Sequence, residues 1–139
     1  MIYRQKILMA MVQELGGNIP QGILQPLLFL FCHSYIEHNH YYDFVPSAEG
    51  PISLQAQEEK KLLANKKLLE SADDWIALPS KKRFAAELDF FEKIAIQQIK
   101  NDTLVSQTKE ILLARIAEKY PYYIRTMKQN SNGEAVFFT

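Results

Sequence analysis

The residues best suited to metal chemistry lie in one short stretch of the N-terminal half. Cys32, His33, His38 and His40 fall close together, and Asp43 follows just beyond them. A thiolate and imidazoles are ligands that Zn²⁺ prefers. Their spacing matches no established zinc signature, however, and Cys32 lies in the most apolar stretch of the chain. We therefore predict a buried structural cysteine and solvated loop histidines, and we expect neither a metal nor another cofactor.

Residues that could serve in other kinds of catalysis have simpler structural explanations. Ser53 and Ser71 fall at the expected ends of helices, where helix capping accounts for a hydroxyl. The pairs Glu58-Glu59 and Asp73-Asp74 are sequential, and neighbours on a helix point about 100° apart, so they cannot share a substrate. Gly16-Gly17 is followed by no Lys-Ser or Lys-Thr, so it is not a phosphate-binding loop. The sequence thus predicts a protein without catalytic residues.

A group of lysines suggests an alternative function in DNA binding. In a helix over residues 53–70, Lys60 and Lys67 share one face, while Lys66 lies elsewhere. Glu59 and Glu70 flank that face, and such mixed charge is typical of a solvated helix. We keep a winged-helix DNA-binding module that uses Lys60, Lys66 and Lys67 as the alternative to a protein-binding module.

Two aromatic segments could form a surface for stacking or for a protein partner. They are Tyr41-Tyr42-Asp43-Phe44 and Tyr120-Pro121-Tyr122-Tyr123. Packing in or near the core, with the hydroxyls reaching water, is the favoured explanation for most of these rings. For contact with a partner we select residues that combine aromatic area, a charge and a turn. These are Tyr42, Asp43, Pro46 and Glu49.

The elements that position these residues are mainly helical. Apolar residues at helical spacing predict helices over 2–15, 18–36, 53–70, 84–99 and 106–120, with a short turn or helix over 120–127. Asn18, Ser53 and Ser106 are the expected N-caps. Pro26 should kink the second helix or delay its start. The stripe that we expect to face the core in the fourth helix consists of Phe84, Leu88, Phe91, Ala95 and Ile99.

Two short segments have the composition of strands. Residues 38–45 are rich in Tyr and Phe and end at Pro46, and residues 73–78 end at Pro79, while 47–51 should form a turn. The predicted fold is mainly α with minor β. It is a winged-helix-like helical domain with a small two-stranded hairpin and additional C-terminal helices.

Composition limits the class of protein. The chain has 139 residues, 47% of them hydrophobic, and its 16 basic residues balance its 16 acidic residues. Zero net charge disfavours a protein that mainly grips nucleic-acid backbone. The apolar run that ends at Phe31 is about half as long as a membrane span requires. A single cysteine fits a reducing compartment, so we expect a cytoplasmic protein that does not bind membranes.

Several stretches, taken in their order along the chain, resemble those of one bacterial family. They are Tyr3–Leu8 with Gly16-Gly17, Leu24–Leu30, Tyr42–Pro46, Gly50–Ala56, Trp75 and Glu118–Tyr123. With these stretches the chain resembles the helical, winged-helix-like region that precedes a "domain of unknown function four-eight-eight", a region itself similar to the Panacea (SocA-like) antitoxin domain. The resemblance implies a regulatory, antitoxin-like interaction module. Its partner would be a toxin-like protein or a following C-terminal domain, and homodimerisation is left open.

The C-terminal residues predict a boundary. Residues 1–128 form the expected helical domain, 129–134 a polar linker, and 135–139 an uncharged strand. An exposed apolar strand is an aggregation hazard, so it suits the first, parallel strand of a following domain. Phe137-Phe138-Thr139 also resembles the first strand of the second domain in proteins of this family, where a second domain follows the helical region. We expect the chain to be a fragment whose tail is disordered or added to a sheet of a neighbouring chain.

Overall fold

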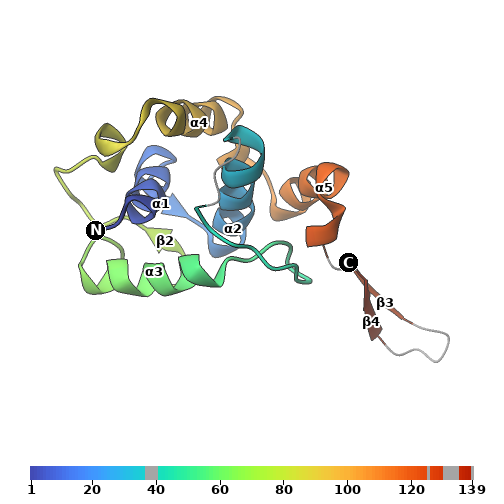
Figure 1. Cartoon of the computed structure of the whole chain (residues 1–139). Helices are drawn as coiled ribbons and strands as arrows, with labels where there is room; N and C mark the ends of the chain where they lie inside the picture. The colour runs from blue at the N-terminus through green and yellow to red at the C-terminus, as the bar shows by residue number, and fades with distance from the viewer. Residues whose placement is uncertain (37–40, 125, 130–134, 139) are drawn as a thin grey trace.

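The centre of the fold consists of two helices. A computed structural model describes residues 1–36 and 41–124, together with the backbone of 126–129 and 135–138. The central helices, α1 (Tyr3–Glu14) and α2 (Gln21–Leu30), lie between α4 (Phe90–Asn101) on one side and α3 (Leu54–Asn65) on the other (Figure 1). Every residue of α1 from Ile7 to Val12 is at most 1% exposed. A helix that is buried on all sides in this way belongs to the core.

The connection between α1 and α2 differs from the prediction. Gly16 and Gly17 both have positive φ and turn the chain after α1, as expected of a glycine-rich helix end. Asn18, however, is not an N-cap but lies in β1 (Asn18–Ile19). Residues Asn18 and Ile19 are extended because they pair with Trp75 and Ile76. Helix α2 therefore begins only at Gln21.

Helix α2 runs through Pro26 and continues into a π-helix, η1 (Phe31–Tyr35). The amide of Ile36 donates to the carbonyl of Phe31 at 3.1 Å, five residues back. Single π-helical turns of this kind are rare and occur frequently at functional sites. Figure 1 shows this helical continuation below α4, and η1 contacts that helix directly.

The β structure is small, and of the two predicted strands over 38–45 and 73–78 only the second forms as expected. β2 (Trp75–Ile76) falls within predicted strand 73–78 and pairs antiparallel with β1, while Ala77 forms a bridge with Leu69. In predicted strand 38–45, residues 38–40 lie outside the described part of the chain, and 41–44 are not a strand. Only Val45 forms an isolated bridge, with Ile52 across the turn. The mainly α class with minor β is confirmed.

Helix α3 begins as predicted and ends early. The Ser53 side chain accepts from the Ala56 amide at 3.2 Å, which confirms it as the N-cap. Gln25 of α2 secures this point, because its amide group bonds both the N–H and the carbonyl of Ser53. The helix stops at Asn65 instead of residue 70, because Lys67 adopts a positive φ of 60° that turns the chain.

The C-terminal helices correct two further predictions. Phe84 and Leu88 are buried but precede α4, since Phe84 lies in a short 3-10 helix, η2 (Phe84–Glu87). Phe91 is 73% exposed, so the predicted stripe has the wrong phase there. Helix α5 (Lys109–Lys119) is capped by Thr108 instead of Ser106. The helix ends before Pro121, as expected. Two further 3-10 turns are η3 (Leu104–Ser106) and η4 (Pro121–Tyr123).

The C-terminal tail pairs within its own chain. Strand β4 (Ala135–Phe138) pairs antiparallel with β3 (Thr126–Gln129), and Met127 lies opposite Phe137. The predicted strand is therefore present, but its partner is a preceding strand of the same chain, and Gln129 belongs to a strand instead of the linker. The tail therefore forms a paired strand in this chain, and its addition to a sheet of a neighbouring chain stays a prediction. Figure 1 shows the hairpin extending away from the helices beyond α5.

Candidate functional site

A groove between η1 and α4 combines an open cavity with exposed aromatic and acidic side chains. We call it the η1–α4 groove. Its cavity of about 720 Å³ lies within the size range of ligand sites. The π-helix and the residues just after it supply one wall, and the first half of α4 supplies the other. The described residues that matter here are Tyr35, Tyr41, Asp89, Phe91, Glu92 and Ile94.

A buried carboxylate lies at the base of this groove. Glu92 is 4% exposed, and the Tyr41 hydroxyl donates to its Oε1. Burial, reinforced by the hydrogen bond to Glu92, raises the pKa of Tyr41 well above its usual value, so this hydroxyl keeps its proton. A second tyrosine, Tyr35, donates to Asp102 Oδ2 at 2.5 Å, and the pKa of Tyr35 is raised to about 12 by burial and that bond.

The rim of the groove carries large apolar side chains. Phe90 and Phe91 are 68% and 73% exposed, and Ile94, one turn further along α4, is 39% exposed. The two phenylalanine rings meet edge to face with centroids 5.8 Å apart. The spacing of apolar residues predicts Phe91 in the core, because steps of three and four residues fit more than one phase of the helix. The phase that faces the core contains Ala95, Ile96 and Ile99 together with Glu92.

The groove continues along η1 toward α5. An adjoining cavity of about 630 Å³ shares Ser34, Tyr35 and Gln98 with the first. Its other end carries charges of both signs, including Asp102 and Arg115. The exposed side of the π-helix therefore borders two neighbouring cavities. Among the described residues, acidic side chains without basic ones line only the cavity beside Phe91.

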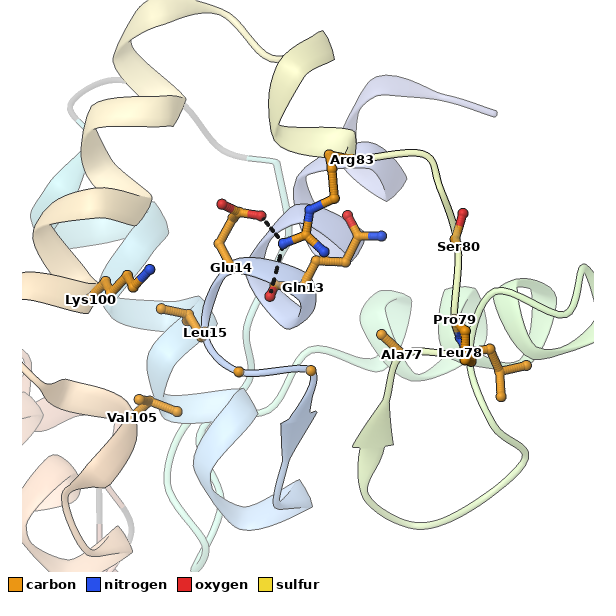
Figure 2. A pocket seen from close by; sticks show the side chains of 12 residues that line it. Gln13, Glu14, Leu15, Ala77, Leu78, Pro79, Ser80, Arg83, Lys100 and Val105 are labelled. Carbon is orange, nitrogen blue, oxygen red and sulfur yellow. Dashed lines mark hydrogen bonds and ion pairs between the residues drawn. The ribbon is translucent and has the colours of Figure 1, made fainter.

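A separate cavity lies where α1 ends (Figure 2). Its volume is about 720 Å³, and Lys100 and Val105 line one side while Pro79 and Ser80 line the other. Figure 2 shows the guanidinium of Arg83 directed at Glu14, with which it forms an ion pair of 2.5 Å. Because these two charged groups bind each other, they are poorly placed to hold a ligand, and we favour the η1–α4 groove as the candidate site.

Of the four residues selected from the sequence for partner contact, Tyr42 does not lie on the surface. Tyr42 is 2% exposed and its hydroxyl donates to Glu59 Oε2 at 2.5 Å, so its ring is part of the core. Asp43 is exposed and is held by a reciprocal pair of hydrogen bonds with Gln55. Pro46 is half-buried, and the exposed Glu49 forms an ion pair with Lys109 of α5.

The three lysines of the DNA-binding alternative do not share one exposed helix face. Lys60 is 9% exposed, its Nζ donates to the Asp73 carbonyl, and it lies 5.0 Å from the centre of the Trp75 ring. Burial lowers the pKa of Lys60. Lys66 and Lys67 are exposed at the end of α3, beyond its last turn. Lys60 is therefore not available to a phosphate, and no common helix face presents all three lysines.

Cys32 follows the structural explanation, whereas His33 is not the solvated loop histidine that the sequence predicts, because it lies in η1 and packs among aromatic rings. Cys32 is buried, and burial raises the pKa of its thiol to about 12. His33 stacks on Phe29 with ring centroids 4.1 Å apart, and it also meets Phe44 and Tyr120 edge to face. Three rings of the two aromatic segments thus pack around His33, namely those of Phe44, Tyr120 and Tyr123. His38 and His40 lie outside the described residues.

Comparison with known proteins gives no relative from which to transfer a function. No family model matches the chain, and neither a curated protein nor a solved structure matches it. Among the described residues, no helix has the length and apolar character to cross a membrane. The function is therefore argued from the groove itself.

Proposed function

We propose that this protein is a non-enzymatic interaction module that binds another protein through the rim of the η1–α4 groove. The observation that carries the proposal is the exposure of Phe90, Phe91 and Ile94 together on one short stretch of α4. Contiguous exposed apolar side chains mark interaction surfaces, and aromatic residues supply much of the binding energy at such surfaces. A regulatory, antitoxin-like role in the cytoplasm with a toxin-like partner is the form that the family resemblance implies.

The test is site-specific photo-crosslinking of the full chain in cells. A photoreactive phenylalanine analogue at position 91 should form a defined adduct with a partner, whereas the same analogue at Tyr122, which is also exposed, should not. A third position, Ala48, lies between Pro46 and Glu49 and tests the contact surface predicted from the sequence.

The partner identified in this way is then used to measure affinity. Phe91→Ala should weaken binding about tenfold or more, as expected for an aromatic hot spot. Asp43→Asn should leave the affinity unchanged if the contact lies at α4. A specific adduct at position 48 but not at 91 would move the interface to the turn, and unchanged affinity in Phe91→Ala would contradict the proposal.

A further inference from the structure

The η1–α4 groove has a composition that selects one kind of side chain. We propose that it receives an arginine side chain carried by an apolar segment of the partner protein. This inference rests on the proposed function and adds to it the chemistry of the partner. Three features of the groove support it: its charge, its aromatic walls and the apolar surface beside it.

The charge of the groove is negative on a protein that is neutral as a whole. Asp89 and Glu92 both line the cavity, and its described lining contains neither lysine nor arginine. The complete chain, by contrast, balances 16 basic against 16 acidic residues. The negative charge is thus local, and a cation is its complement. Because Glu92 is 4% exposed, salt screens its attraction for a cation less than that of a surface carboxylate.

The hydrogen-bonding capacity of Glu92 favours a guanidinium. The Tyr41 hydroxyl donates to its Oε1. A carboxylate offers about four lone-pair positions, more than one hydroxyl fills. A guanidinium presents several N–H donors in a planar fork, which matches carboxylate geometry better than an ammonium does.

The walls of the groove suit the rest of an arginine side chain. Tyr35, Tyr41 and Phe91 supply aromatic rings, on which a guanidinium can stack. Ile36 and Ile94 supply aliphatic surface for the methylene groups that precede the charge. A cavity of about 720 Å³ accommodates such a chain.

The apolar rim indicates what surrounds the arginine in the partner. Phe90 is 68% exposed and contacts the Phe91 ring, so the two form a surface at the edge of the groove. A partner segment that places its arginine in the groove would lay the adjacent side chains on these rings. Apolar neighbours of the arginine are therefore expected, because they bury the phenylalanine surface.

The experiment compares two capped tripeptides that differ only in the terminal group of one side chain, which is a charged guanidinium in one and a neutral urea in the other. The probes are acetyl-Leu-Arg-Leu-amide and acetyl-Leu-citrulline-Leu-amide, because citrulline is a neutral analogue of arginine with the same shape. Titration into the ¹⁵N-labelled full chain, followed by NMR, should shift the amides of Tyr35, Tyr41 and residues 89–94. The arginine peptide should bind about tenfold more tightly than the citrulline peptide.

Substitutions identify the groups responsible. Asp89→Asn keeps a side chain suited to the N-cap of α4 and removes one charge, so it should reduce the preference for arginine several-fold. Glu92→Gln should reduce it further. Asp43→Asn is the matched control, because it removes an exposed carboxylate that does not line the cavity.

The results separate this inference from the proposed function. Equal binding of the two peptides, shifts confined to other parts of the chain, or an unchanged arginine preference in both Asp89→Asn and Glu92→Gln would overturn the arginine site. The crosslink at position 91 and the effect of Phe91→Ala on the natural partner would still stand in that case. Loss of those two results would instead contradict the proposed function.

Discussion

At the scale of single residues, buried polar side chains connect segments that are distant in the sequence. The Glu59 carboxylate, which is 4% exposed, accepts from Arg4 Nε and from the Tyr42 hydroxyl. Arg4 lies on α1 and Glu59 on α3, while Tyr42 belongs to the loop between η1 and α3. These three residues therefore fix the loop against both helices. The aromatic character of Tyr42 is evident from the sequence, but its buried hydrogen bond is not, because the partner Glu59 lies 17 residues further along the chain.

Removal of the Tyr42 hydroxyl should reduce stability. In Tyr42→Phe, the buried Glu59 carboxylate loses one of its donors, and the expected cost is about 1–3 kcal/mol in the free energy of unfolding. Urea denaturation followed by circular dichroism measures this cost. Tyr122→Phe is the control, since Tyr122 is 61% exposed and should change stability by less than about 0.5 kcal/mol. If the urea midpoints of Tyr42→Phe and the unmodified protein were equal, the hydrogen bond from Tyr42 to Glu59 would not stabilise the fold.

Alkaline pH should destabilise the protein through its buried acids. Burial raises the pKa of Cys32 to about 12, and burial with a bond to Asp102 raises that of Tyr35 to about 12. In the unfolded chain the Cys32 thiol ionises at about pH 8.5 and the Tyr35 hydroxyl at about pH 10. The folded state therefore holds its protons more tightly. The contribution of these two groups to the free energy of unfolding should be fully present below about pH 8.5. It should be lost progressively as the pH rises toward 12.

Two measurements check this expectation. Unfolding midpoints in urea should decrease above about pH 8.5, and Cys32→Ala should flatten the first part of that decrease. In the folded protein at neutral pH, the Cys32 thiol should react with a thiol reagent only after denaturant is added, because the reactive form is the thiolate. Rapid labelling of the native protein would show that the thiol is accessible.

At the scale of elements, the sequence predicts helices better than it predicts their phase and their connections. The N-cap at Ser53 was predictable because a local side-chain bond creates it. The strand at Asn18–Ile19 was not, because it forms only when the distant Trp75–Ile76 lies beside it. The exposure of Phe91 depends on which face of α4 packs on α1 and η1, which the spacing of apolar residues leaves open. The candidate groove could not be predicted for the same reason.

The turn over residues 47–51 shows how one element is fixed to another. Gly50 has a positive φ of 90°, its amide donates to the Ser47 carbonyl at 3.0 Å, and a side chain there would overlap Leu113 of α5. Gly50→Ala should therefore cost about 2 kcal/mol, mainly from backbone strain at the positive φ, with a shift of the Leu113 side chain. Thermal or urea unfolding measures this cost.

A glycine in a helix provides the contrast. Gly22 lies in α2, and the nearest atom to an added Cβ is Lys109 Cδ at 3.4 Å. Gly22→Ala should be neutral or stabilising by up to about 1 kcal/mol, because the helix propensity of alanine is higher than that of glycine. Similar destabilisation by both substitutions would contradict the role assigned to the turn.

At the scale of the whole molecule, the helices form one core and the C-terminal hairpin extends from it. The buried hydrophobic residues of the described chain run from Ile7 to Ile116, and Ile124 packs against them from outside. The pairing of β3 with β4 involves only residues after Ile124. A two-stranded hairpin is at best marginally stable alone. The folding of the helical body should therefore not depend on this hairpin.

Truncation after Ile124 tests this division of the molecule. The shortened chain keeps every residue that the structure describes as buried, so its Tm should lie within about 2 °C of that of the full chain. Differential scanning calorimetry measures the Tm, and hydrogen exchange of the full chain gives an independent control. Amides of β3 and β4 should exchange much faster than those of α1, because local opening of a hairpin costs less than unfolding of the core. A loss of many degrees on truncation, or hairpin amides as protected as those of α1, would show that the hairpin is part of the folded body.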